Sequence, residues 1–181
     1  MEYIVIMSEY RRARVKGGLY CFTVVTYHRK NILCTETAFA RLRHAFAYVK
    51  TQYPFQLKAW VILPDHLHCI WQLPENDADF SVRWRMLKRY FSIGFNHSSN
   101  HRREKLIWQR RFWEHVIRDQ ADYMRCLNYI HYNPVKHGYV TRARDWHYSS
   151  FLHYVSKGYY DLAWGSCDQD EPRAMQDVIR E

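Results

Sequence analysis

Two histidines separated by one residue are the first side chains whose spacing suggests chemistry. His66 and His68 flank Leu67 in an apolar run, residues 66–73, that is typical of a β-strand. Because successive side chains of a strand point to opposite faces, both imidazoles would leave the same face and could bind one metal ion. Chance alone supplies roughly 0.7 such pairs in a chain of 181 residues with 11 histidines, so the pair is informative only in its strand context.

A second group of polar side chains lies near the end of a predicted helix over residues 119–133. Tyr129 and Asn133 are one helical turn apart on one flank, beside a core stripe that includes Leu127 and Ile130. An amide oxygen is an acceptable third ligand for a hard divalent cation beside two imidazoles, which favours Mg²⁺ or Mn²⁺. Taken singly, Asn133 could equally make a helix-terminal hydrogen bond, and Tyr129 could be a buried aromatic side chain.

The hydrophobic periodicity predicts the elements that must position these side chains. Runs with a period of two predict strands, and apolar residues at i, i+3 and i+7 predict helices. The expected order is a strand over 19–27, a helix between the Thr35 or Thr37 cap and Pro54, strands over 56–63 and 66–73, a helix over 80–91, a strand over 107–117, and a helix over 119–133 that stops near Pro134. This βαββαβ order predicts an α+β, ferredoxin-like split βαβ fold: a central antiparallel sheet, with the first and third strands in the middle, and an additional C-terminal helix.

Composition limits the class of protein. The net charge of +9 favours a polyanionic partner, and an aromatic fraction of 17% among those cations suits the stacking of unpaired bases. The five cysteines, at positions 21, 34, 69, 126 and 167, form neither a disulfide framework nor a CxxC zinc motif, which favours a reducing cytoplasm. No run approaches the ~18 uncharged apolar residues of a membrane-spanning helix, so we expect no membrane partner.

Three longer blocks carry a resemblance to a known family. They are Pro64-Asp65-His66-Leu67-His68-Cys69-Ile70-Trp71, then Arg111-Phe112-Trp113-Glu114-His115, then Tyr129-Ile130-His131-Tyr132-Asn133-Pro134-Val135-Lys136-His137-Gly138. Together with Tyr10-Arg11-Arg12, Gly17-Gly18 and Ala59-Trp60-Val61-Ile62-Leu63, they resemble the REP-associated tyrosine transposases, which are relatives of the single-tyrosine HUH transposases. The similarity covers roughly residues 8–165, in matching order and spacing.

The resemblance implies a HUH endonuclease and strand transferase that acts on single-stranded DNA. His66 and His68 match the paired metal-binding histidines, Tyr129 matches the nucleophile, and Asn133 matches the position that completes the Mg²⁺ or Mn²⁺ site. In this family the tyrosine forms a 5′-phosphotyrosine intermediate, and reversal of the attack rejoins the DNA without ATP, as transposition requires. The sequence names no general base, and His131 lies about 200° around the helix from Tyr129.

The family acts on REP hairpins, and a basic patch would bind the hairpin phosphates. The residues expected to contact DNA are Arg11, Arg12, Arg14, Lys16, Arg83, Arg85, Lys88, Arg89, Arg110, Arg111 and Trp113. Trp113, Trp84 or Tyr132 could stack unpaired bases. We expect a single-tyrosine transposase domain over residues 8–164 and an acidic tail over residues 165–181. We also expect a monomer, with a dimer that exchanges catalytic helices as the alternative.

Other functions remain open at this point. A ferredoxin-like sheet with basic and aromatic residues could bind single-stranded nucleic acid without cutting it, although the aromatic strand motif of RRM domains is missing. A structural zinc site at His66 and His68 would need further ligands at zinc spacing, which the sequence lacks around this pair. Replication initiation and conjugative relaxation share HUH chemistry, but the block Tyr-Ile-x-x-Asn-Pro is not expected in those proteins.

Overall fold

A computed structural model describes residues 12–95 and 106–167, and within them the predicted α+β order is confirmed. The elements are β1 (Leu19–Val25), α1 (Glu36–Gln52), β2 (Gln56–Ile62), β3 (His66–Gln72), α2 (Phe80–Ser92), β4 (Trp113–Val116), α3 (Gln120–Lys136) and α4 (Phe151–Ser156). In the described residues the four strands form one antiparallel sheet in the order β2-β3-β1-β4. The first and third strands are therefore central, as the ferredoxin-like prediction required.

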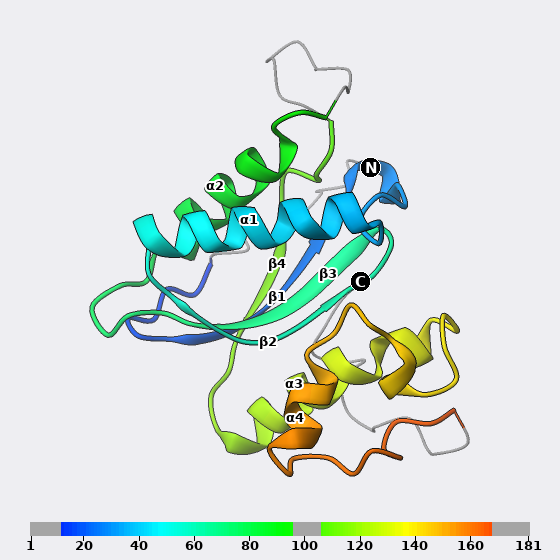
Figure 1. Ribbon diagram of the computed structural model, residues 1–181. Helices are drawn as coiled ribbons and strands as arrows, with labels where there is room; N and C mark the ends of the chain where they lie inside the picture. The colour runs from blue at the N-terminus through cyan, green and yellow to red at the C-terminus, as the bar shows by residue number, and fades with distance from the viewer. Residues whose placement is uncertain (1–11, 96–105, 168–181) are drawn as a thin grey trace, which may run out of the picture.

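The sheet separates two hydrophobic clusters. Helices α1 and α2 cover one face and α3 lies on the other, with α4 beside α3 (Figure 1). Alternation along β3 produces this division, because Leu67, Cys69 and Trp71 belong to the cluster under α1 and α2. Ile70 belongs to the cluster under α3. His66 and His68 share the side of Ile70, which places them on the α3 face.

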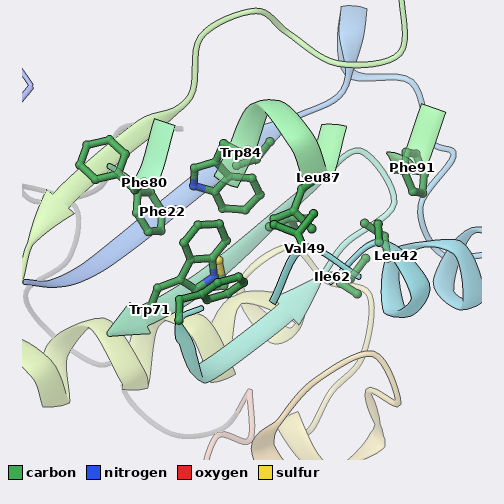
Figure 2. Close-up of a cluster of buried hydrophobic side chains, with 14 of the residues drawn as sticks. Phe22, Leu42, Val49, Ile62, Trp71, Phe80, Trp84, Leu87 and Phe91 are labelled. Atoms are coloured by element: carbon green, nitrogen blue, oxygen red, sulfur yellow. The ribbon is translucent and has the colours of Figure 1, made fainter. Parts of the chain in front are cut away.

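Aromatic side chains in mutual contact fill much of the cluster under α1 and α2 (Figure 2). The ring of Trp71 stacks on Trp84 with centroids 4.3 Å apart and lies 4.3 Å from Phe55 and 4.8 Å from Phe22. Offset aromatic pairs at these separations add stability beyond the area they bury. Trp84 is only 2% exposed, so it is a core residue and cannot stack a DNA base.

The ends of all four predicted strands and of the last helix differ from the prediction. The three strands before α2 end one or two residues earlier than expected, whereas β4 spans only Trp113–Val116 instead of residues 107–117. Before β4, Ile107 is buried in the core and Trp108 forms one isolated β-bridge with Thr26. This segment therefore packs beside the sheet without pairing as a continuous strand. The polar run Gln109-Arg110-Arg111 interrupts the apolar alternation at that point.

Helix α3 does not stop before Pro134 but continues through it to Lys136. A proline inside a helix removes one N–H donor, and the resulting cost can be offset by packing. Pro134 is buried, and the turn around it is closed by hydrogen bonds from the His137 N–H to the Asn133 carbonyl and from the Tyr139 N–H to the Pro134 carbonyl. The start of α3 is as predicted, because the Asp119 carboxylate accepts from the Asp122 N–H.

Arg83 was predicted to contact DNA, and this prediction is wrong. Its side chain is 1% exposed and donates hydrogen bonds to the Asp77 carboxylate and to the carbonyls of Pro54 and Asp79. The guanidinium therefore joins the start of α2 to the end of α1, and a phosphate cannot reach it. The clustering of basic residues along α2 could not reveal that one of them points into the protein.

We expect Arg83→Ala to lower the free energy of unfolding by about 2–4 kcal/mol, because it removes the guanidinium that donates to Asp77 Oδ2 and to two carbonyls. Arg85→Ala is the matched control, since Arg85 is exposed on the same helix and should change stability by less than about 0.5 kcal/mol. Urea denaturation monitored by circular dichroism measures both values. Equal stability of the two variants would show that the buried arginine has no structural role.

Candidate active site

The two histidines of β3 form a buried pair on the α3 face of the sheet. Their rings are 4.9 Å apart and nearly perpendicular, and the residues are 2% and 0% exposed. His68 Nδ1 lies 2.8 Å from Thr23 Oγ1, and His66 Nδ1 lies 2.5 Å from Asp65 Oδ1. Partners at Nδ1 orient an imidazole and make Nε2 the nitrogen that can bind a ligand.

Asp65 orients His66 from the turn between β2 and β3. Its second carboxylate oxygen accepts a hydrogen bond of 2.9 Å from Arg29. Burial opposes ionisation of Asp65, but the hydrogen bonds and charges of His66 and Arg29 outweigh it and lower its pKa to about 2. Asp65 was not among the residues predicted for the site, although its position directly before a histidine was the available signal.

Tyr129 lies over this histidine pair. Its ring packs against the His68 ring with centroids 5.2 Å apart, and the residue is 6% exposed. Lys136, two turns further along α3, places its Nζ 5.0 Å from the centroid of the Tyr129 ring. Asn133 is fully buried one turn after Tyr129 on the same helix. The structure thus brings Tyr129 and His68 together, and sequence reasoning did not single out the ammonium beside them.

Cross-strand pairing extends the site towards the edge of the sheet. His68 pairs with Thr23, and Thr23 pairs with Trp113 on β4, so the three side chains form one row on the α3 face. Trp113 is half-buried and is a partly buried neighbour of the cluster under α3. Of the predicted DNA contacts, Trp113 is therefore aligned with the histidine pair.

The two histidines near Tyr129 in sequence lie in different surroundings. The His137 ring is 5.4 Å from that of His66. His131 lies on another flank of α3, where its nitrogens are 2.8 Å from Ser150 Oγ and 3.2 Å from the Tyr160 hydroxyl. Burial lowers the pKa of His131 to about 3, so it is a neutral side chain that supports the packing of α3.

The predicted DNA-binding cations are spread over several surfaces. Arg12 is held by Glu114 at 2.6 Å and stacks over Phe112 at 4.0 Å. Lys88 donates to the Gln109 carbonyl, and burial together with the nearby Arg12 charge lowers its pKa to about 8. The exposed cations of the set are Arg14, Lys16, Arg85, Arg89, Arg110 and Arg111. Arg11 lies outside the described residues. The cations of α2 are on the opposite side of the sheet from the histidine pair.

The family described as Transposase IS200 like matches residues 4–133. The chain therefore belongs to the IS200-like transposase family. It is 49% identical over 158 residues to the REP-associated tyrosine transposase of Escherichia coli, covering 87% of this chain and 91% of the relative. With this similarity the chain belongs to the REP-associated tyrosine transposases within that family.

Two further comparisons agree. A relative from Haemophilus influenzae is 46% identical over 166 residues, which cover 88% of this chain and 94% of the relative. A solved structure of a REP-associated tyrosine transposase bound to a REP hairpin has a TM-score of 0.77 and 44% identity, covering 93% of this chain and 98% of that one. Among the described residues, no helix is long and apolar enough to cross a membrane.

Proposed function

We propose that this chain is a metal-dependent endonuclease and strand transferase that nicks and rejoins single-stranded REP-like hairpin DNA. The observation that carries the proposal is the contact between the Tyr129 ring and His68, the second histidine of the pair on β3. It places a hydroxyl-bearing ring beside two nitrogen donors, which is the arrangement that a tyrosine nucleophile needs. Membership of the transposase family supports this chemistry over simple binding.

The donor set fits a divalent cation. His66 Nε2 is buried and makes no hydrogen bond within the described residues, as expected for a nitrogen reserved for a metal ion. Two imidazoles and the Asn133 amide oxygen would form a nitrogen and oxygen set suited to Mg²⁺ or Mn²⁺. A bound cation would neutralise the charge that develops on the scissile phosphate.

Tyr129 supplies the nucleophile in this proposal. Its phenolate oxygen forms a bond to the scissile phosphorus while the bond to the 3′ oxygen breaks, which leaves a 5′-phosphotyrosine and a free 3′-hydroxyl. The ammonium of Lys136 lies 5.0 Å from the centroid of the Tyr129 ring, so a positive charge is available beside the nucleophile and the phosphate that it attacks. Attack by a 3′-hydroxyl on the phosphotyrosine reverses the step and rejoins DNA, so no ATP is needed.

Recognition of a hairpin is inferred from the relative and from the surface of this chain. The similar solved structure contains a REP hairpin. Trp113 would stack an unpaired base near the histidine pair, and exposed cations such as Arg14, Arg110 and Arg111 would contact phosphates. Because Tyr129 lies over the histidines of its own chain, a monomer can contain the complete site.

The direct test is incubation of the full chain with a labelled single-stranded REP hairpin and Mn²⁺. We expect a labelled protein–DNA product that resists denaturation and is absent when EDTA replaces Mn²⁺. A shifted hairpin in a native gel without any covalent product would instead identify a non-catalytic binding module. A product of equal yield in EDTA would contradict metal dependence.

A further inference from the structure

A second group of metal-binding side chains lies at the start of α3, away from the histidine pair. His115 of β4 and Asp122 and Cys126 of α3 place one ligand atom each within 4.8 Å of one another. His115 Nε2 and Asp122 Oδ2 are 2.8 Å apart. Ligands of a tetrahedral zinc ion are about 3.4–3.8 Å apart, given metal–ligand distances of about 2.0–2.3 Å. Small side-chain movements would therefore bring the three atoms around one ion.

A fourth donor adjoins the group. Cys21 of β1 pairs directly with His115 across the sheet, and its side chain is fully buried. Cys21, His115, Asp122 and Cys126 thus come from three elements that pack together. His115, Asp122 and Cys126 supply three donors, and the thiol of Cys21 would complete a tetrahedral set for zinc.

The burial of these side chains suits a structural ion. Cys21 and Cys126 are fully buried, and the Asp122 side chain is 4% exposed. The His115 side chain is 17% exposed and gives the group an opening to solvent. Asp122 is also oriented from outside the group, because it accepts hydrogen bonds from the Arg118 N–H and from Arg125. Such supporting bonds to a ligating carboxylate strengthen metal sites.

We propose that His115, Asp122, Cys126 and Cys21 form a second cation site that is specific for a thiophilic ion of the Zn²⁺ class. Binding releases the thiol protons to solvent, leaves the imidazole proton of His115 on Nδ1, and replaces the hydrogen bond between His115 Nε2 and Asp122 with two metal–ligand bonds. Thiolates select Zn²⁺ over Mg²⁺ and Mn²⁺, so this site and the nitrogen and oxygen set at His66 and His68 take different metals.

The proposed ion would fix the position of α3. Asp122, Cys126, Tyr129 and Asn133 follow one another at intervals of four, three and four residues along one flank of the helix. An ion held by the first two of these side chains would fasten the first half of α3 to β1 and β4. Tyr129 lies in the next turn and would be held over His68 as a consequence.

The test uses Co²⁺ as a spectroscopic probe on the full chain after chelator treatment. A cobalt–thiolate bond gives a near-ultraviolet charge-transfer band, and the histidine pair on β3 cannot produce one. We expect the band to saturate at one Co²⁺ per chain and to disappear when Zn²⁺ displaces the cobalt. The Tm of the protein should be higher with Zn²⁺ present than without it. Cys126→Ser should at least halve the band, because it leaves Cys21 as the one thiolate on the ion, whereas Cys34→Ser, a matched change at a half-buried cysteine elsewhere, should keep the band at full intensity.

Failure of the second metal site and failure of the proposed function give different results. His68→Ala should keep the cobalt–thiolate band, so loss of DNA cleavage alone leaves the second site intact. If Cys126→Ser fails to fold, His115→Gln tests the same site from the sheet and should weaken Co²⁺ binding at least tenfold. A wild-type protein without the band, or a band of undiminished intensity in Cys126→Ser, would show that these side chains form only a hydrogen-bonded helix start.

Discussion

Tyr129→Phe is expected to reduce the covalent protein–DNA product on the order of 10³-fold or more, while hairpin affinity stays within about twofold. The substitution removes only the hydroxyl, so the ring still packs against His68 and the surface offered to DNA is unchanged. In the proposed reaction the Tyr129 oxygen is the atom that attacks the phosphorus, so the phenylalanine variant has no nucleophile. Denaturing gels measure the product, and native gels with the same labelled hairpin measure the affinity.

Tyr123→Phe is the matched control for this experiment. Tyr123 lies on the same helix and shares a hydrogen bond of 2.8 Å with the Tyr154 hydroxyl, remote from the histidine pair. This variant should form the covalent product at nearly the wild-type rate. A product that survives in Tyr129→Phe, or disappears equally in both variants, would rule out Tyr129 as the nucleophile.

His68→Ala is expected to lower the cleavage rate at saturating Mn²⁺ at least about 100-fold, since it removes a proposed metal ligand that is fully buried. Thr23→Val should cause a smaller loss of about 10–100-fold, because Thr23 only orients the imidazole through its 2.8 Å contact with Nδ1. Cleavage rates measured across a Mn²⁺ titration separate weaker metal binding from a lower maximal rate.

The exposed His147 offers a matched control for the histidine variant. His147→Ala should leave the Mn²⁺ dependence unchanged, and His68→Ala should still bind the hairpin. If His68→Ala cleaves DNA with the wild-type dependence on Mn²⁺, the histidine pair is not the metal site.

The parts of the fold that local periodicity encodes were predictable. The alternation along β3 assigned Leu67 and Trp71 to one face and the histidines to the other, and the structure has both placements. The start of α3 at the Asp119 cap followed from the same local chemistry. Each of these features depends on residues a few positions apart, which a single sequence displays directly.

Other features depend on contacts between distant segments. Arg83 is buried because Asp77 and the Pro54 carbonyl meet it, and α3 passes Pro134 because packing offsets the missing donor. The extent of β4 was overestimated, since apolar residues at 107 and 108 contact the core without pairing as a strand. Spacing along one chain does not reveal such tertiary effects.

The candidate site shows the same limit. Tyr129 and the histidine pair could be named from residue type, spacing and resemblance, and the structure places the Tyr129 ring against that of His68. Asp65 and Lys136 were not assigned, because their importance arises from what the fold brings next to them. The pairing of His115 with Asp122 likewise joins a strand to a helix and has no local signature.

The two-sided character of β3 makes its register a requirement for both stability and chemistry. A slip of one residue against β1 would exchange the two sides of the strand. Leu67 and Cys69 would then face Tyr129, and the imidazoles would enter the aromatic cluster around Trp71. The backbone hydrogen bonds between β1 and β3 therefore determine both the packing of the hydrophobic core and the side chains that contact Tyr129. The short hairpin at Pro64 and Asp65 should consequently tolerate no single-residue insertion.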